Sequence, residues 1–277
     1  MIRVGCAFRA GLMPWLWQHP ESYDVFEHSL DAFVGAGSDG LRAAATCAGM
    51  GEYTLHCIGL SLGSESITER GQFLDEISAV LKIMEATEFS DHLSFCRVDD
   101  IRMHDFAALW RVEEQLDLFV RNVDFVQHRL GVQLSVENVA TLFDLPGEIR
   151  PAEFANEVSR RTGCALLLDI SNVLINESNG FGDAAAEFDE LDLGAVTQVH
   201  LAGGEMVDGR TWDAHSHPVP SADLVWLERL LPRLTNCTSI IVERDERLQD
   251  GQELIDDLMS VREVVERVTT QAVSALP

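Results

Sequence analysis

The chain alternates eight short runs of β-forming residues with longer segments of helical periodicity. Such alternation is typical of βα units whose strands lie parallel in one sheet. Eight units in one continuous run favour a closed ring over an open doubly wound sheet. The chain has 277 residues, close to the roughly 250 of such barrels. The sequence therefore predicts an α/β fold, a (β/α)8 TIM barrel, as a single domain over residues 1–277. The predicted strands are Ile2–Ala7, Tyr23–His28, Tyr53–Ile58, Glu88–Leu93, Val132–Glu137, Ala165–Ile170, Val196–Leu201 and Ser239–Glu243.

The helical segments carry apolar residues at three- and four-residue spacing. Pro151 suits the first turn of its helix, and Gly131 and Gly163 suit the position just beyond a helix end. The segments after the first two strands, Gly11–Pro20 and Gly35–Gly51, are ambiguous between helix and loop. The clearest predicted helices are Glu69–Glu85, Phe106–Leu130, Pro151–Thr162, Ala222–Arg233 and Gln252–Val268.

The composition is strongly acidic, with a formal net charge of −26. That charge argues against nucleic acid and anionic membranes as partners, because both require a basic surface. No apolar stretch approaches the roughly 20 residues of a membrane span, and the amino terminus does not have the pattern of a signal peptide. We therefore expect a cytoplasmic protein. Six scattered cysteines without a CxxC pair are expected to be free thiols.

Polar side chains recur where the predicted strands end. In a barrel those carboxyl ends converge on one rim, the usual place of the active site. Barrel strands are otherwise apolar, and an ionisable residue there is costly unless it is paired or binds a metal. The residues at or just after these ends are His56, Asp91, His92, Glu137, Asn138, Asp169, Asn172, His200, Glu243 and Asp245, and the segment after the seventh strand adds Asp213, His215 and His217.

Each of these residues alone has an ordinary reading. A single strand histidine is most often structural, a strand-end carboxylate often caps the next helix, and Asn172 could form an Asx turn. Asp213 and His215 could be solvated loop residues. Their coincidence on one predicted rim instead favours metal binding.

The ligand types narrow the choice of metal. Imidazole and carboxylate without thiolate suit iron, manganese, zinc or cobalt. Four histidines with Glu137, Glu243, Asp213 and Asn172 exceed one site, so two or three ions could be held, with Glu137 as the expected bridge. Open positions on octahedral iron suit oxygen activation, and zinc-dependent hydrolysis fits the same residues.

Six segments, in this order, resemble one known family. They are HCIGLSLGS (56–64), FSDHLSF (89–95), LSVENVA (134–140), LLLDISNVLINESNGFG (166–182), VHLAGG (199–204) and WDAHSHPVP (212–220). Together they are similar to the multinuclear non-heme iron-dependent oxidative enzymes, a (β/α)8 family that includes the methanobactin-maturation iron oxygenase. The resemblance runs from about the second to the eighth predicted strand.

The resemblance implies two or three iron ions in mixed Fe(II) and Fe(III) states, with dioxygen as co-substrate. It also implies oxidation of a cysteine, or another residue, in a ribosomally synthesised precursor peptide, assisted by a partner protein that binds the leader. Asp169 is then a ligand or an orienting residue, and Asp169 and Glu27 are the candidate catalytic residues. The family's metal ligands fall on His56, His92, Glu137, Asn172, His200, Asp213, His215 and Glu243.

The sequence departs from many relatives at two strand ends. Arg9 is followed by AGLMPWLW where many have a histidine, and the second strand offers Glu27 and Asp31 in place of a Glu–Asn–Tyr run. These differences bear on the substrate and product. The alternative function is a divalent-metal isomerase or hydrolase of the xylose-isomerase-like or endonuclease-IV-like barrels. A non-catalytic binding barrel is a third reading.

Overall fold

A computed structural model describes residues 2–98, 101–145 and 147–274. Most strands are short, and two antiparallel pairs accompany the parallel ones. The strands are β1 (Arg3–Ala7), β2 (Val25–Ser29), β3 (Tyr53–His56), β4 (Glu88–His92), β5 (Phe95–Val98), β6 (Ile101–Ala107), β7 (Gln133–Glu137), β8 (Ala165–Asp169), β9 (Val196–Val207), β10 (Arg210–His217) and β11 (Ser239–Glu243).

The main sheet closes on itself. Its strand order is β10-β9-β11-β1-β2-β3-β4-β7-β8, and β9 also pairs with β8. The registered pairs β1–β2, β1–β11, β9–β11, β3–β4, β4–β7 and β7–β8 are all parallel. Setting aside the antiparallel β10, the ring holds the eight strands predicted from the sequence. The (β/α)8 barrel is thus confirmed.

Internal contacts divide the chain into two compact units, here unit 1 and unit 2. Unit 1 contains the chain up to Glu27 and from Leu168 onward, and unit 2 is His28–Leu167. The boundaries fall inside strands β2 and β8. The single-domain assignment stays a prediction.

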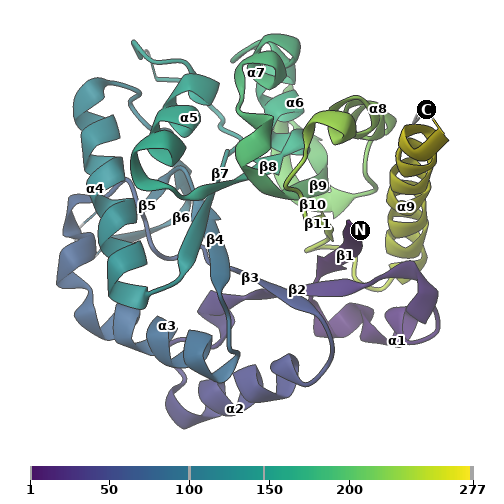
Figure 1. Ribbon diagram of the computed structural model, residues 1–277, viewed down its shortest axis with the longest axis horizontal. Coiled ribbons are helices and arrows are strands. Elements are labelled where there is room, and N and C mark those ends of the chain that lie inside the picture. Colours follow the sequence, from purple (N-terminus) through teal and green to yellow (C-terminus); the bar gives the residue numbers. More distant parts are fainter. Residues whose placement is uncertain (1, 99–100, 146, 275–277) are drawn as a thin grey trace. The chain divides into compact units, whose positions relative to one another are not determined.

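Helices follow most of the strands (Figure 1). The α-helices are α1 (Met13–Leu16), α2 (Gly37–Ala48), α3 (Gly71–Ile83), α4 (Glu113–Leu130), α5 (Pro151–Thr162), α6 (Ile170–Ser178), α7 (Ala184–Glu190), α8 (Ser221–Leu230) and α9 (Gly251–Ser274). Short 3-10 turns are η1 (Ala10–Leu12), η2 (Pro20–Ser22), η3 (Leu30–Ala32), η4 (Glu65–Glu69), η5 (Leu193–Ala195) and η6 (Leu231–Arg233).

In unit 1 the long helix α9 packs against α1, α8 and strand β1 (Figure 1). Leu254, Leu258, Val261 and Val265 are buried along it. Their spacing of three and four residues places them on one face, so the helix is held by a continuous apolar stripe. The strands beneath are apolar, with Ile240, Ile241 and Val242 fully buried in β11.

In unit 2 helix α4 packs against α3 and α5 (Figure 1). Phe119 of α4 and Phe154 of α5 meet edge to face, with ring centroids 5.9 Å apart. Both helices end at the predicted glycines, Gly131 and Gly163, which adopt φ of 72° and 69°. A residue with a Cβ is strained in that left-handed conformation, and glycine is not.

The prediction of one helix over Phe106–Leu130 was wrong at its start. The structure instead has a β5–β6 hairpin, and α4 begins at Glu113. Phe106 lies in β6, where its ring packs on His92 with centroids 4.0 Å apart. This tertiary contact outweighs a local helical pattern. Of the two segments that were ambiguous between helix and loop, the first contains η1 and α1 and the second contains α2.

The segment after the seventh predicted strand is also more regular than expected. Asp213 and His215 lie in strand β10, not in a loop, and β9 extends to Val207 to pair with it. Helices α6 and α7 were not among the clearest predicted helices. The remaining predicted elements differ from the observed ones chiefly at their ends.

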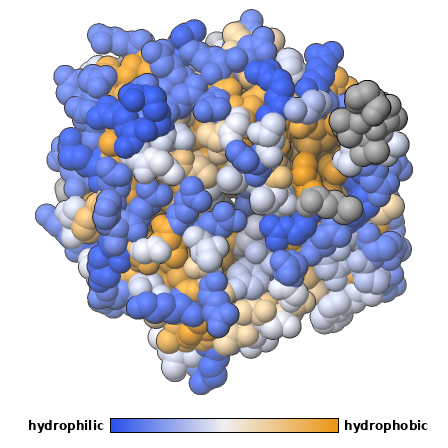
Figure 2. Space-filling view, viewed as in Figure 1, coloured by the Kyte–Doolittle hydropathy of each residue, from blue (hydrophilic) through white to orange (hydrophobic). Residues whose placement is uncertain are grey.

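The face shown in Figure 2 is largely hydrophilic, with separate hydrophobic patches, consistent with the acidic composition. Throughout the described ranges, each helix is either too short or too polar to serve as a membrane span.

Candidate metal centre

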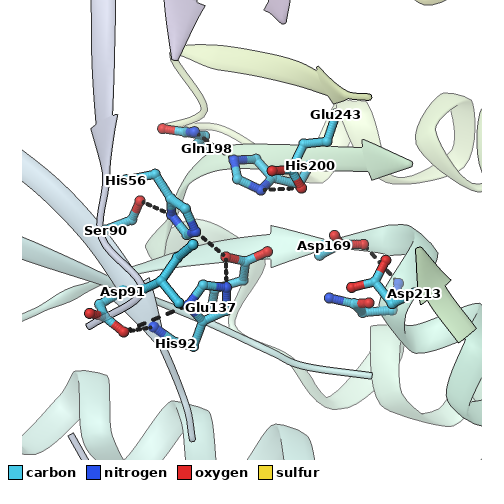
Figure 3. Close-up of polar contacts among 12 residues, drawn as sticks. His56, Ser90, Asp91, His92, Glu137, Asp169, Gln198, His200, Asp213 and Glu243 are labelled. Carbon is cyan, nitrogen blue, oxygen red and sulfur yellow. Dashed lines mark hydrogen bonds and ion pairs between the residues drawn. The ribbon is translucent and has the colours of Figure 1, made fainter. Parts of the chain in front are cut away.

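In unit 2 the ends of three neighbouring strands bring together two histidines and a glutamate. His56, His92 and Glu137 end β3, β4 and β7, and all three side chains are buried. Oε2 of Glu137 lies 3.2 Å from Nε2 of His92 and 3.6 Å from Nε2 of His56 (Figure 3). We call these three residues the His92 group.

Neighbouring side chains fix both imidazole rings. Nδ1 of His56 lies 2.8 Å from the Ser90 hydroxyl, which itself donates to the carbonyl of Leu55 at 3.3 Å. A hydroxyl has one proton, so His56 donates through Nδ1 and presents Nε2 to Glu137. The backbone N–H of His92 donates to Asp91 Oδ1 at 2.6 Å, and Asp91 Oδ2 accepts from Leu60. Asp91 therefore anchors its strand end.

In unit 1 His200 lies between two glutamates. Its Nε2 is 3.2 Å from Oε2 of Glu27 and its Nδ1 is 3.1 Å from Oε2 of Glu243. The amide of Gln198 donates to Glu27 and lies 2.8 Å from His200 Nε2. Donor atoms of Asp169, His200 and Glu243 all lie within 4.8 Å of one another. His200, Glu243, Asp169 and Glu27, all candidate site residues in the sequence analysis, thus lie together within this unit.

A bulge in β10 adds two more candidate ligands to unit 1. Trp212 pairs with Glu205, and His217 pairs with Gly203. The four residues between the paired positions of β10 therefore lie opposite a single residue of β9. The extra residues, Asp213 to Ser216, bulge from the ladder, which re-aims their side chains. A Cβ on Gly203 would lie 2.0 Å from the His217 carbonyl oxygen, so the close approach of these strands requires glycine there.

His215 occupies the centre of this bulge with a φ of +48°. Its Nε2 lies 2.9 Å from Asp213 Oδ1 and 3.7 Å from Glu243 Oε2. Burial by itself would lower the pKa of His215, but the carboxylates of Glu243, Asp213 and Asp245 outweigh burial and hold the pKa well above its usual value. The carboxylates of Asp213 and Glu243 therefore favour a positive charge, a proton or a metal ion, at Nε2. We call Glu27, Asp169, His200, Asp213, His215 and Glu243 the His200 group.

The DISN segment (169–172) has a clear structural role in unit 1. Asp169 caps α6, its Oδ1 accepting from the N–H of Asn172 at 2.7 Å. The Ser171 hydroxyl donates to Asp223, and its oxygen accepts from the N–H of Ala202 at 2.9 Å. The segment therefore fixes α6 against β9 just beyond His200. Asn172 is buried in the first turn of α6, and its role as a ligand stays a prediction.

The donor sets of both groups fit a metal ion. Two ligands at right angles on an ion with bonds of about 2.0–2.2 Å lie about 3 Å apart. The distances of 2.9, 3.1 and 3.2 Å between imidazole nitrogens and carboxylate oxygens have this length. Imidazole with excess carboxylate suits iron, manganese, zinc or cobalt. Each unit thus holds its own cluster of potential metal ligands.

Sequence reasoning missed two supporting residues, Ser90 and Gln198. Each stands two positions before a histidine on the same strand, Ser90 before His92 and Gln198 before His200. Residues two apart on a strand face the same side, so this spacing could have identified them. His217 was counted among the strand-end residues, but it pairs with Gly203 and its Nδ1 contacts Ser216.

Curated proteins with similar sequences include two UPF0276 proteins. A UPF0276 protein of Streptomyces avermitilis is 32% identical over 225 residues, covering 78% of this chain and 46% of that protein. A UPF0276 protein of Rhizorhabdus wittichii is 32% identical over 212 residues, covering 76% of this chain and 75% of that protein. The chain thus spans less than half of the Streptomyces relative and three quarters of the Rhizorhabdus one.

The fold is similar to that of a solved D-psicose 3-epimerase from Clostridium cellulolyticum H10. The TM-score is 0.62 at 15% identity, covering 95% of this chain and 99% of the epimerase, a likeness of fold alone. The model of the RiPP precursor modification enzyme family MbnB/TglH/ChrH, where RiPP denotes a ribosomally synthesised and post-translationally modified peptide, matches residues 3–266. The family match, the barrel and the two buried donor sets agree, and the chain belongs to the MbnB/TglH/ChrH family.

Proposed function

We propose that this chain is a multinuclear non-heme iron-dependent oxygenase or oxidase. It uses dioxygen to modify a cysteine, or another residue, of a ribosomally synthesised precursor peptide. The proposal includes a leader-binding partner protein and a cytoplasmic location. Membership of the MbnB/TglH/ChrH family supports the peptide substrate.

The observation that carries the proposal is the presence of two buried donor sets of the same chemistry. The His92 group offers two imidazoles whose Nε2 atoms lie 3.6 and 3.2 Å from the same carboxylate oxygen of Glu137. The His200 group offers two imidazoles among several carboxylates. One set would suffice for a mononuclear hydrolase. Two sets in one chain favour a multinuclear enzyme.

Iron bound at these residues would supply Lewis acidity and one-electron redox chemistry with dioxygen. The protein's own residues hold and tune such ions. Glu27, Glu243 and Asp213 place negative charge around the two imidazoles of unit 1, which favours the more highly charged oxidation state. Ser90 holds His56 with Nε2 facing Glu137, so this imidazole need not reorient when an ion binds. Burial of His200 and Glu243 keeps bulk water from competing for the ligands.

Oxygen consumption with a candidate peptide tests the proposal. The iron-loaded protein, its partner and a cysteine-bearing precursor peptide encoded beside its gene should consume dioxygen and shift the peptide mass only in air. The Cys→Ser peptide should fail, because a thiol ionises near neutral pH and a serine hydroxyl does not. Anaerobic turnover without another electron acceptor would contradict the proposal. So would equal reaction of the serine peptide.

Metal replacement separates the proposal from the isomerase or hydrolase alternative. Activity should follow iron content, and zinc-loaded protein should be inactive. Activity restored by zinc alone would support the alternative. His92→Phe should abolish turnover with an unchanged circular dichroism spectrum, because it removes the ring nitrogens of the last residue of β4 and keeps a ring against Phe106. The control is His128→Phe, which makes the same change at an exposed histidine of α4.

A further inference from the structure

We propose that Arg9 and Asp245 are positioning residues that orient His215 as a metal ligand through Nε2. The inference deepens the proposed function and rests only on its metal-binding part. All the residues involved lie in unit 1. They come from the segments that follow β1 and β11 and from the bulge of β10.

Asp245 holds His215 at two points. Its Oδ2 lies 3.1 Å from Nδ1 of the His215 ring. Its backbone N–H donates to the His215 carbonyl oxygen at 2.9 Å. These two contacts fix the ring and the backbone together. They explain how a residue other than glycine is kept at a φ of +48°, a conformation that neighbouring structure must impose.

Arg9 in turn holds Asp245. Its Nε donates to Asp245 Oδ1 at 2.6 Å, and its Nη2 forms an ion pair with the same oxygen. The remaining Nη1 donates to the carbonyl of Phe8 at 2.9 Å, which anchors the guanidinium to the end of β1. The guanidinium therefore occupies Oδ1 and leaves Oδ2 for the histidine.

The consequence for His215 follows from the donor and acceptor count. A carboxylate only accepts hydrogen bonds, so Nδ1, which is hydrogen-bonded to Oδ2 of Asp245, carries a proton. Nε2 is buried without a hydrogen-bond partner among the described residues, so it is the ring atom that a metal ion would bind. That atom faces Asp213 Oδ1 at 2.9 Å and Glu243 Oε2 at 3.7 Å. A carboxylate behind a ligand histidine fixes its tautomer and raises its basicity, and loss of such a partner typically costs about 10–100-fold in metal affinity.

A purely stabilising ion pair would have a different signature. The side chains of Arg9 and Asp245 are 29% and 40% exposed, and ion pairs at such exposure contribute about 0–1 kcal/mol to stability. Replacement should therefore change metal binding and leave the melting temperature nearly unchanged. The pair Arg161–Asp117 on helices α5 and α4, with exposures of 29% and 45%, offers a matched control that contains no candidate ligand.

The test measures Zn²⁺ binding to the purified full chain without peptide, iron or air. Competition titrations of Asp245→Asn should show the Zn²⁺ affinity of one site lowered by about 10–100-fold. The Zn²⁺ affinity of the remaining site should equal that of the wild type. Arg9→Gln should weaken the site that Asp245→Asn weakens, to a smaller extent, because it acts through Asp245. Asp117→Asn, which makes the same change of charge, should match the wild type.

A spectroscopic readout identifies the nitrogen directly. Long-range ¹H–¹⁵N spectra of the Zn²⁺-loaded, ¹⁵N-histidine-labelled protein should show His215 protonated at Nδ1 and ligated through Nε2. Protonation at Nε2 would overturn the proposal, as would wild-type Zn²⁺ affinity in Asp245→Asn. Equal weakening of all sites with a lowered melting temperature would also overturn it, because that pattern marks a structural role. Failure of peptide oxidation would leave these Zn²⁺ results intact, so the two proposals fail separately.

Discussion

Oε2 of Glu137 lies 3.2 Å from Nε2 of His92, and the two residues are paired partners in the register of β7 and β4. Parallel pairing thus places the two ligand candidates at the same level on adjacent strands. His56 pairs with Ser90, two residues before His92 on β4, and its Nδ1 contacts that serine. The strand register itself therefore assembles the His92 group.

Glu137→Gln should reduce metal content by about one ion per chain. The substitution keeps the shape and removes the negative charge that pairs with His56 and His92. Glu85→Gln is the control, because Glu85 is exposed in the turn that follows α3. Elemental analysis after metal loading measures the difference. Equal metal content in the two variants would show that Glu137 is not a ligand.

Gly203→Ala should disrupt the β9–β10 hairpin and lower metal binding by Asp213 and His215. Its Cβ would lie 2.0 Å from the carbonyl oxygen of His217, which forces the strands apart. Gly71→Ala serves as the control, because no atom lies within 4 Å of the added Cβ. Thermal unfolding should show a lower melting temperature, and Zn²⁺ titration a weaker affinity, for Gly203→Ala but not for Gly71→Ala. Wild-type binding by Gly203→Ala would contradict the role assigned to the bulge.

Arg244→Met should lower the free energy of unfolding by about 3–5 kcal/mol, because the loss of one partner leaves buried charge uncompensated. Arg244 is 1% exposed, and its guanidinium lies 2.9 Å from Glu253 and 3.0 Å from Asp257 of α9. Arg160→Met, at an exposed pair on α5, should cost less than about 1 kcal/mol. Chemical denaturation measures both, and similar losses in the two variants would refute this reading of Arg244.

Asp223→Asn should gain stability relative to the wild type as pH rises. Burial raises the pKa of Asp223 to about 6, partly opposed by the hydrogen bond from Ser171. A carboxyl group whose pKa is raised on folding stabilises the folded state below its unfolded pKa, near 4, and loses this effect as pH rises through 6. A difference of that size corresponds to about 3 kcal/mol.

The measurement compares unfolding free energies of Asp223→Asn and wild type at pH 4 and pH 7. Asp257, whose pKa is also raised to about 6, contributes equally to both proteins and cancels in the difference. The difference should move in favour of the variant by about 2–2.5 kcal/mol over this range, less than the full value of about 3 kcal/mol because the carboxyl of the unfolded chain is already partly ionised at pH 4. A constant difference, or movement in favour of the wild type, would show that Asp223 is not protonated in the folded state.

The strand ends of this chain were predictable because their signal is local. Runs of apolar residues such as LLL before Asp169 and IIV before Glu243 mark buried parallel strands, and the polar residue that ends each run stands out against them. The hairpin β5–β6 escaped prediction because its stability comes from partners elsewhere in the chain, such as the packing of Phe106 on His92. Local patterns do not contain such contacts.

The sequence by itself determined the order of strands and helices, the barrel and the identity of the polar residues at the strand ends. Only the tertiary structure decided how those residues are oriented. The bulge that aims Asp213 and His215 depends on a register shift between two strands. The ring orientation of His215 depends on Asp245, 30 residues away, and on Arg9, 236 residues from Asp245. Hydrogen bonds and register act between residues distant in the chain, whereas periodicity reports only which face of its own element a side chain occupies.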